Sequence, residues 1–147
     1  MNLKKLFLKH CEDNKYEINQ DQLDIIKNLK DFYSVNFNQT IFNKIFKKNN
    51  YKLGFYLVGD VGVGKTLILN FFFNQLKEKK LRLHFNEFMI KFHNFNFKNK
   101  DKENGIDNFV ENLNNKAQII YFDEFQVTNI VDAMILGKLC DRIFKED

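Results

Sequence analysis

The residues best suited to chemistry in this chain lie in one glycine-rich stretch, GDVGVGKT. Gly59, Gly64, Lys65 and Thr66 follow the spacing G-x-x-x-x-G-K-T, and Gly62 adds a further glycine. A loop that wraps a phosphate with its backbone needs positions without side chains, and glycine adopts positive φ at little cost. Successive N–H groups and the positive end of a following helix then face the anion. The stretch therefore predicts a phosphate cradle; the alternative is a turn that precedes a surface lysine.

Each residue of this stretch has an expected part in binding a nucleotide. The Lys65 ammonium is expected to reach the β- and γ-phosphates, and the Thr66 hydroxyl is expected to ligate Mg²⁺. The nucleotide-binding set that we predict is Gly59, Asp60, Val61, Gly62, Val63, Gly64, Lys65 and Thr66.

A second group with chemical potential is the acidic pair that ends the apolar run IIYFDEF. Acids at the carboxyl end of a buried parallel strand lie at the edge where open α/β sheets bind ligands. Asp123 is expected to hold Mg²⁺ through its water shell, and Glu124 to orient and polarise the attacking water. An acidic pair alone is also typical of a solvated strand end. Together with the glycine-rich loop, it predicts hydrolysis of the nucleotide, with Glu124 and Lys65 as catalytic residues and with Thr66 and Asp123 as metal ligands.

The elements around these motifs alternate in type after residue 50. Apolar runs and alternating patterns predict strands, and longer amphipathic stretches predict helices. The predicted strands are 53–59, 81–88 and 117–125, the predicted helices are 66–80, 106–115 and 127–146, and a polar loop is expected at 94–105. The alternation of strands and helices indicates a parallel sheet covered by helices, an α/β fold.

The first fifty residues differ from the rest in carrying helical patterns only. A helix is predicted at 21–33, with Asn19 or Asp21 as its cap, and a shorter one at 40–48. Leu3, Leu6 and Phe7 are consistent with another short amphipathic helix. We therefore divide the chain into an N-terminal helical segment, 1–50, and a core, 51–147.

Composition and charge limit the classes of protein to consider. The chain has 147 residues, a net charge of +4 and two cysteines far apart in sequence. No apolar run approaches the roughly 20 residues of a membrane span. A folded domain in a reducing compartment fits these values, and the charge allows an anionic partner without demanding one. We expect a cytoplasmic protein.

Three stretches strongly resemble one family: GFYLVGDVGVGKTLILNFFF, RLHFNEFM and YFDEFQVTNIVDAMILGKL. They are similar to the ZapE cell-division ATPases and their mitochondrial AFG-like relatives, in the AAA+ branch of the P-loop NTPases. The resemblance implies a three-layer α/β/α core with a parallel sheet, with ATP and Mg²⁺ as cofactors. It also implies protein partners in the division ring at the inner face of the membrane, or in quality control. Peripheral membrane association and an oligomer follow as expectations.

The chain departs from the family pattern at three positions and in length. Val63 stands in place of an arginine, Asn86 in place of a histidine and Asn129 in place of an aspartate. The implied sheet order is 5-1-4-3-2, and only strands 1 to 3 are predicted here. Strand 4 belongs between strands 1 and 3, and the backbone groups facing that gap would need partners. We therefore expect an incomplete core, in a fragment of a longer protein or a truncated reading frame.

Two other functions remain as hypotheses. The chain is alternatively a fragment that binds the nucleotide without hydrolysing it, because the arginine finger and sensor residue implied by the family are not present. A third interpretation is an AAA+ loader module acting on nucleic acid, since phenylalanines and lysines interleave at 91–102; we do not expect nucleic acid to bind. Phe88 and Met89 are candidate partner contacts, or else core residues.

Overall fold

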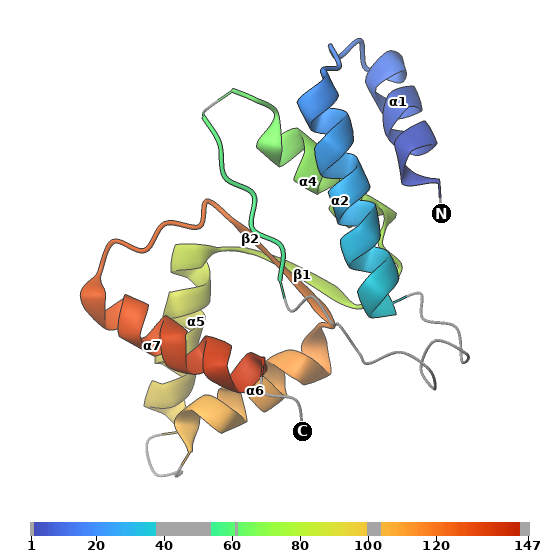
Figure 1. The fold of residues 1–147 in the computed structure, drawn as a ribbon. Helices are drawn as coiled ribbons and strands as arrows, with labels where there is room; N and C mark the ends of the chain where they lie inside the picture. Colours follow the sequence, from blue (N-terminus) through green and yellow to red (C-terminus); the bar gives the residue numbers. More distant parts are fainter. Residues whose placement is uncertain (1, 38–53, 61, 100–103, 145–147) are drawn as a thin grey trace. The chain divides into compact units, whose positions relative to one another are not determined.

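The computed structural model describes residues 2–37, 54–60, 62–99 and 104–144 (Figure 1). The chain divides into two compact units, residues 1–75 and 76–147. The first unit contains three described helices, α1 (Leu3–Asp13), α2 (Gln20–Phe37) and α4 (Lys65–Gln75). The second contains two described strands and three described helices. Their bounds are β1 (Lys80–His84), α5 (Phe85–Lys98), α6 (Gly105–Lys116), β2 (Ile119–Asp123) and α7 (Ile130–Ile143).

Helix α1 forms because its apolar residues recur once per turn. Leu3, Phe7 and Cys11 are buried, which places the inward face at intervals of four residues. The helix is capped by Asn2, whose Oδ1 accepts a hydrogen bond from the Lys5 N–H at 3.2 Å. The short N-terminal helix expected from the sequence is therefore present.

Helix α2 begins with a reciprocal cap. Asn19 Oδ1 accepts from the Gln22 N–H at 2.9 Å, and Gln22 Oε1 accepts from the Asn19 N–H at 3.2 Å. This exchange is a capping box, and it confirms Asn19 as the cap. The helix continues to Phe37, beyond the predicted end at 33. The helix predicted at 40–48 lies outside the described residues.

Aromatic packing joins the three helices of the first unit. Phe7 of α1 meets Phe71 of α4 with 5.1 Å between ring centroids, and Tyr33 of α2 meets Phe72 with 6.4 Å. Helix α4 ends at Gln75, earlier than the predicted 80. The cause is tertiary, because Lys80 enters strand β1 and pairs with Ile119 of β2.

The strand predicted at 53–59 is not observed, and the prediction is wrong for its described residues, 54–59. A strand exists only where a neighbour completes its hydrogen-bond ladder. In the described residues, the sheet has two strands, β1 and β2, and both belong to the second unit. Tyr56 and Val58 are 73% and 77% exposed, so the apolar side chains of this stretch do not mark a buried strand.

The sheet of the second unit has one apolar and one polar face. Strands β1 and β2 are parallel, and Arg82 lies opposite Tyr121 while His84 lies opposite Asp123. Because side chains alternate along a strand, these four residues share one face. The other face carries Leu81, Leu83, Ile120 and Phe122, which pack in the core.

Helices α5, α6 and α7 cover the apolar face of this sheet. Their buried residues form one cluster with Leu83, composed mainly of phenylalanines: Phe85, Phe88, Met89, Phe92, Phe109, Val110, Leu113 and Leu139. The predicted strand 81–88 is therefore too long, because it ends at His84 and α5 follows at once. The expected loop at 94–105 is wrong for 94–98, which continue α5.

The burial of α5 also corrects the partner hypothesis for its aromatic residues. Phe88 and Met89 are 1% and 3% exposed, so they are core residues and not contacts for a partner. Phe92, in the stretch of interleaved phenylalanines and lysines, is likewise buried at 3%, whereas Phe97 is 68% exposed. Among the described residues, no helix is both long and apolar enough to cross a membrane.

Candidate functional site

The glycine-rich stretch folds into a loop that leads directly into helix α4. Gly62 and Gly64 have φ values of 89° and 83°, which lie in the region that favours glycine. The Gly64 carbonyl accepts from the Ile68 N–H at 3.0 Å, so the helix begins at Lys65. The first N–H groups of a helix have no acceptor within it. The loop therefore ends where backbone donors and the helix dipole favour an anion.

The Lys65 side chain folds back over its own loop. Its Nζ donates to the carbonyl oxygens of Gly59 at 2.6 Å and Asp60 at 2.5 Å. These contacts hold the ammonium beside the loop backbone that precedes α4. Thr66 is exposed and Val63 is 45% exposed, so neither side chain is committed to the core. Val61 lies outside the described residues.

The first helical turn of α2 also reaches the loop. A Cβ atom built on Gly64 would lie 2.9 Å from Gln22 Nε2, closer than carbon normally approaches. The capping box orients the other end of that amide toward Asn19. Gly64 thus meets two requirements at once, a positive φ and close approach of a neighbouring side chain.

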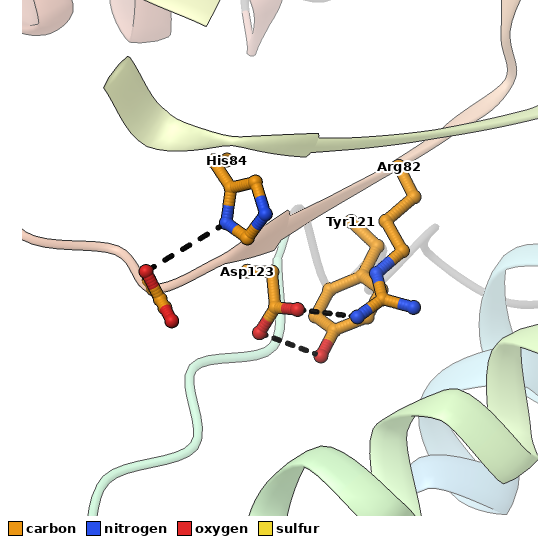
Figure 2. A network of polar contacts seen from close by, with 5 residues as sticks. Arg82, His84, Tyr121 and Asp123 are labelled. Atoms are coloured by element: carbon orange, nitrogen blue, oxygen red, sulfur yellow. Dashed lines mark hydrogen bonds and ion pairs between the residues drawn. The ribbon is translucent and has the colours of Figure 1, made fainter. Parts of the chain in front are cut away.

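Asp123 lies at the end of strand β2 and is held by two neighbours on the polar face (Figure 2). Arg82 forms an ion pair with its Oδ2, and the Tyr121 hydroxyl lies 3.3 Å from its Oδ1. The Asp123 side chain is 13% exposed and that of Arg82 is 42% exposed. The Arg82 guanidinium also lies over the Tyr121 ring, 5.2 Å from its centroid.

These contacts change the pKa values of all three groups. Burial opposes ionisation of Asp123, but the hydrogen bond and charge of Arg82 outweigh it and hold the pKa of the carboxyl below its ordinary value. Burial and the Asp123 charge raise the pKa of Tyr121 to about 12. The hydrogen bond to Asp123 raises the pKa of Arg82. Asp123 is therefore a carboxylate at neutral pH.

Glu124 follows with an unusual backbone conformation. Its φ is 50°, in the left-handed region that residues other than glycine seldom adopt. Its side chain is 80% exposed, and its Oε2 lies 3.8 Å from Nδ1 of His84, the last residue of β1. Strained backbone of this kind occurs often at functional sites. One end of the sheet thus carries two carboxylates, a guanidinium and an imidazole, which belong to Asp123, Glu124, Arg82 and His84.

This end of the sheet is hollowed. A depression of about 200 Å³ is lined by Arg82, Leu83, His84, Glu87 and Asp123. The structure thus brings together the two predicted acids, and it brings together the predicted residues of the glycine-rich loop that it describes. The loop belongs to the first unit and the acids to the second.

Sequence reasoning missed three residues around these groups. Arg82 was visible only as a polar position in an alternating strand, and Tyr121 only as part of an apolar run. Gln22 had a local signal, because it stands three residues after a capping asparagine. Asn129 also gains a role: its Oδ1 accepts from the Val131 N–H at 2.8 Å and caps α7, as an aspartate in its place would.

Comparison with known proteins gives one family for nearly the whole chain. The sequence model of the AFG1-like ATPase family matches residues 2–147. The cell division protein ZapE of Escherichia coli K12 is 35% identical over 92 residues, which cover 62% of this chain and 24% of ZapE.

Two further relatives show the same pattern. Lactation elevated protein 1 homolog B of Danio rerio is 35% identical, over 63% of this chain and 21% of that protein. An uncharacterized protein of Schizosaccharomyces pombe is 32% identical, over 63% of this chain and 22% of its own length. The matched part is thus a quarter or less of each relative. No solved structure matches the chain.

Proposed function

Because the chain belongs to the AFG1-like ATPase family, we propose that it binds ATP and hydrolyses it to ADP and phosphate with Mg²⁺. One observation carries the proposal: the loop at 59–66 enters α4 with positive φ at Gly62 and Gly64 and with the Lys65 ammonium held beside the loop backbone. This arrangement supports binding of a phosphate chain. The oxygens of Thr66 and Asp123 are ligands of the kind that Mg²⁺ prefers.

Each residue has a definite part in this proposal. The loop backbone and Lys65 bind the phosphates, with the ammonium exchanging its carbonyl acceptors for phosphate oxygens. The Thr66 hydroxyl and the Asp123 carboxylate are the groups that would hold Mg²⁺, which would supply positive charge to the phosphates. Glu124 is exposed and accepts a hydrogen bond from the attacking water, which orients it for in-line attack. At Val63 the phosphate contacts come from the backbone, so its side chain does not prevent binding.

The remaining proposals follow the family rather than a particular contact. In this proposal, the described strands and helices form part of an α/β AAA+ core that has a parallel sheet. One relative is named a cell division protein, which supports a protein partner connected with division. Peripheral attachment at the inner face of the membrane is part of the same proposal.

The experiment compares ATP binding and phosphate release in matched variants of the 147-residue chain. Lys65→Ala removes the ammonium from the loop, and its control is Lys91→Ala, which removes a surface lysine that contacts Glu87 at 2.8 Å. Glu124→Gln removes the carboxylate proposed to orient the attacking water, and its control is Glu111→Gln, at an exposed glutamate of α6. Binding is measured with a fluorescent ATP analogue, and hydrolysis with a phosphate sensor.

The outcomes separate hydrolysis from binding alone. We expect Lys65→Ala to abolish both, Glu124→Gln to abolish hydrolysis while retaining binding, and both controls to behave as the unaltered chain. Binding that depends on Lys65 without phosphate release would make this chain a nucleotide-binding module without hydrolysis. Equal binding by Lys65→Ala and Lys91→Ala would refute the role of the loop.

A further inference from the structure

The carboxylate of Asp123 is engaged at both of its oxygens (Figure 2). Arg82 donates to Oδ2 through Nη2, and the Tyr121 hydroxyl donates to Oδ1 at 3.3 Å. A carboxylate of this kind has lone pairs left, but its negative charge is already matched by a guanidinium. An incoming cation therefore meets a carboxylate that has a cation beside it.

The sheet fixes Arg82 in this position. Strand register sets Arg82 directly opposite Tyr121, and its guanidinium lies over that ring at 5.2 Å from the centroid. Asp123 lies two residues further along β2, on the same face of the sheet. The guanidinium is thus held by a ring and a carboxylate at the same time.

We propose that Arg82 is a positioning residue that competes with Mg²⁺ for Asp123. In the chain without nucleotide, the guanidinium neutralises the carboxylate and holds it on the polar face. When Mg·ATP binds, Asp123 exchanges the guanidinium for the water shell of the metal, and Arg82 remains over the Tyr121 ring. The inference rests on the proposed function, in which Asp123 serves Mg²⁺.

Charge repulsion is the reason for competition. A guanidinium and a divalent cation on one carboxylate are like charges a few ångströms apart, and their repulsion weakens binding of the second. Arg82 is 42% exposed, so water screens this repulsion and the effect is modest. Removing the guanidinium should therefore strengthen metal binding by about threefold to tenfold.

The test measures how nucleotide binding depends on Mg²⁺, without using hydrolysis. The dissociation constant of a fluorescent, non-hydrolysable ATP analogue is measured in EDTA and at graded concentrations of free Mg²⁺. For Arg82→Gln we expect half of the Mg²⁺ effect at about a threefold to tenfold lower concentration of free Mg²⁺. Binding in EDTA should not change, and Arg82→Lys, which keeps the charge, should stay close to the unaltered chain.

The matched control is Arg142→Gln. Arg142 is 37% exposed and forms an ion pair with Asp107 at 2.6 Å in the same unit, so this change removes an arginine from a similar pair away from Asp123. Its Mg²⁺ dependence should not change. Unfolding temperatures are measured for every variant; Arg82→Met, which keeps the stem over the Tyr121 ring, replaces Arg82→Gln if that variant unfolds.

A variant of Asp123 itself distinguishes failure of this inference from failure of the proposed function. If Asp123→Asn leaves the Mg²⁺ dependence unchanged, Asp123 does not serve the metal, and the proposal for its function fails. If Asp123→Asn changes the dependence but Arg82→Gln needs the same or more Mg²⁺, the competition is refuted and the proposed function stands.

Discussion

Alanine substitutions at three glycines offer a graded test of the phosphate loop. Gly54 has no positive φ and nothing within 4 Å of a built Cβ, Gly62 has a φ of 89° and open space, and Gly64 has a φ of 83° with Gln22 Nε2 at 2.9 Å. The three positions therefore present no strain, conformational strain alone, and strain together with a close contact.

The structure sets the order and size of the expected losses of ATP affinity in the three variants. Holding alanine in the left-handed region costs about 1–2 kcal/mol, so we expect Gly62→Ala to lose about 5- to 30-fold in ATP affinity. Gly64→Ala must also displace the Gln22 amide, which is held by its hydrogen bond with Asn19. Losing that bond adds about 1 kcal/mol, for a total loss of about 30- to 150-fold. Gly54→Ala should bind as the unaltered chain does.

The assay must account for a loop that relaxes in the absence of nucleotide. Strain that the free loop avoids appears as lost affinity, and strain that it retains appears as a lower free energy of unfolding. We therefore measure the binding free energy of a fluorescent ATP analogue in EDTA and the free energy of unfolding in urea. For each variant, the losses in these two free energies are added, and the sums are compared. In the Gln22→Ala background, where the contact and the hydrogen bond between Gln22 and Asn19 are already absent, Gly64→Ala should cost about 1 kcal/mol less of the sum than it does in the unaltered chain.

Two results would refute this reasoning. Equal losses for Gly54→Ala and Gly62→Ala would mean that the positive φ is not required for binding. Equal losses for Gly62→Ala and Gly64→Ala, with the same cost of Gly64→Ala in the Gln22→Ala background as in the unaltered chain, would mean that the contact with Gln22 is not a constraint on the loop.

Three further predictions concern stability. Phe88→Ala should lower the free energy of unfolding by about 3–5 kcal/mol in urea titrations, because Phe88 is 1% exposed and packs against Phe109 and Phe122; a loss below 1 kcal/mol would contradict its place in the core. Folding holds the pKa of Tyr121 at about 12, above the ordinary value near 10, so its contribution to stability is present below pH 10 and is lost as the pH rises through 12. Tyr121→Phe should therefore flatten the fall in unfolding free energy between about pH 10 and 12. An unchanged slope would contradict a raised pKa of Tyr121 in the folded protein. Asn129→Ala should lower the free energy of unfolding in urea by about 1 kcal/mol, because the cap of α7 is lost, whereas Asn129→Asp should hardly change it. Equal changes in unfolding free energy for these two variants would show that the cap does not contribute.

Features whose cause is local could be predicted from the amino-acid sequence alone. The spacing of Gly59, Gly64 and Lys65 predicts a loop before a helix, and the structure has this loop entering α4 at Lys65. The cap at Asn19 was predictable because Gln22 follows it by three residues, which is the separation that a capping box requires. The strand before Asp123 and the helix after Asn129 were predictable as types of element, although both are shorter than their patterns.

Features that depend on a partner distant in sequence could not be predicted in this way, because long-range packing and strand pairing create them. The apolar stretch 54–59 has the composition of a strand, yet it forms none, because a strand requires a neighbour to complete its hydrogen bonds. Residues after His84 could continue a strand or begin a helix, and burial of Phe88 against Phe109 and Phe122 selects the helix. Pairing of β1 with β2 brings Arg82 to Asp123 across 41 positions of sequence. No pattern within either strand encodes that contact, because it arises from the register between them.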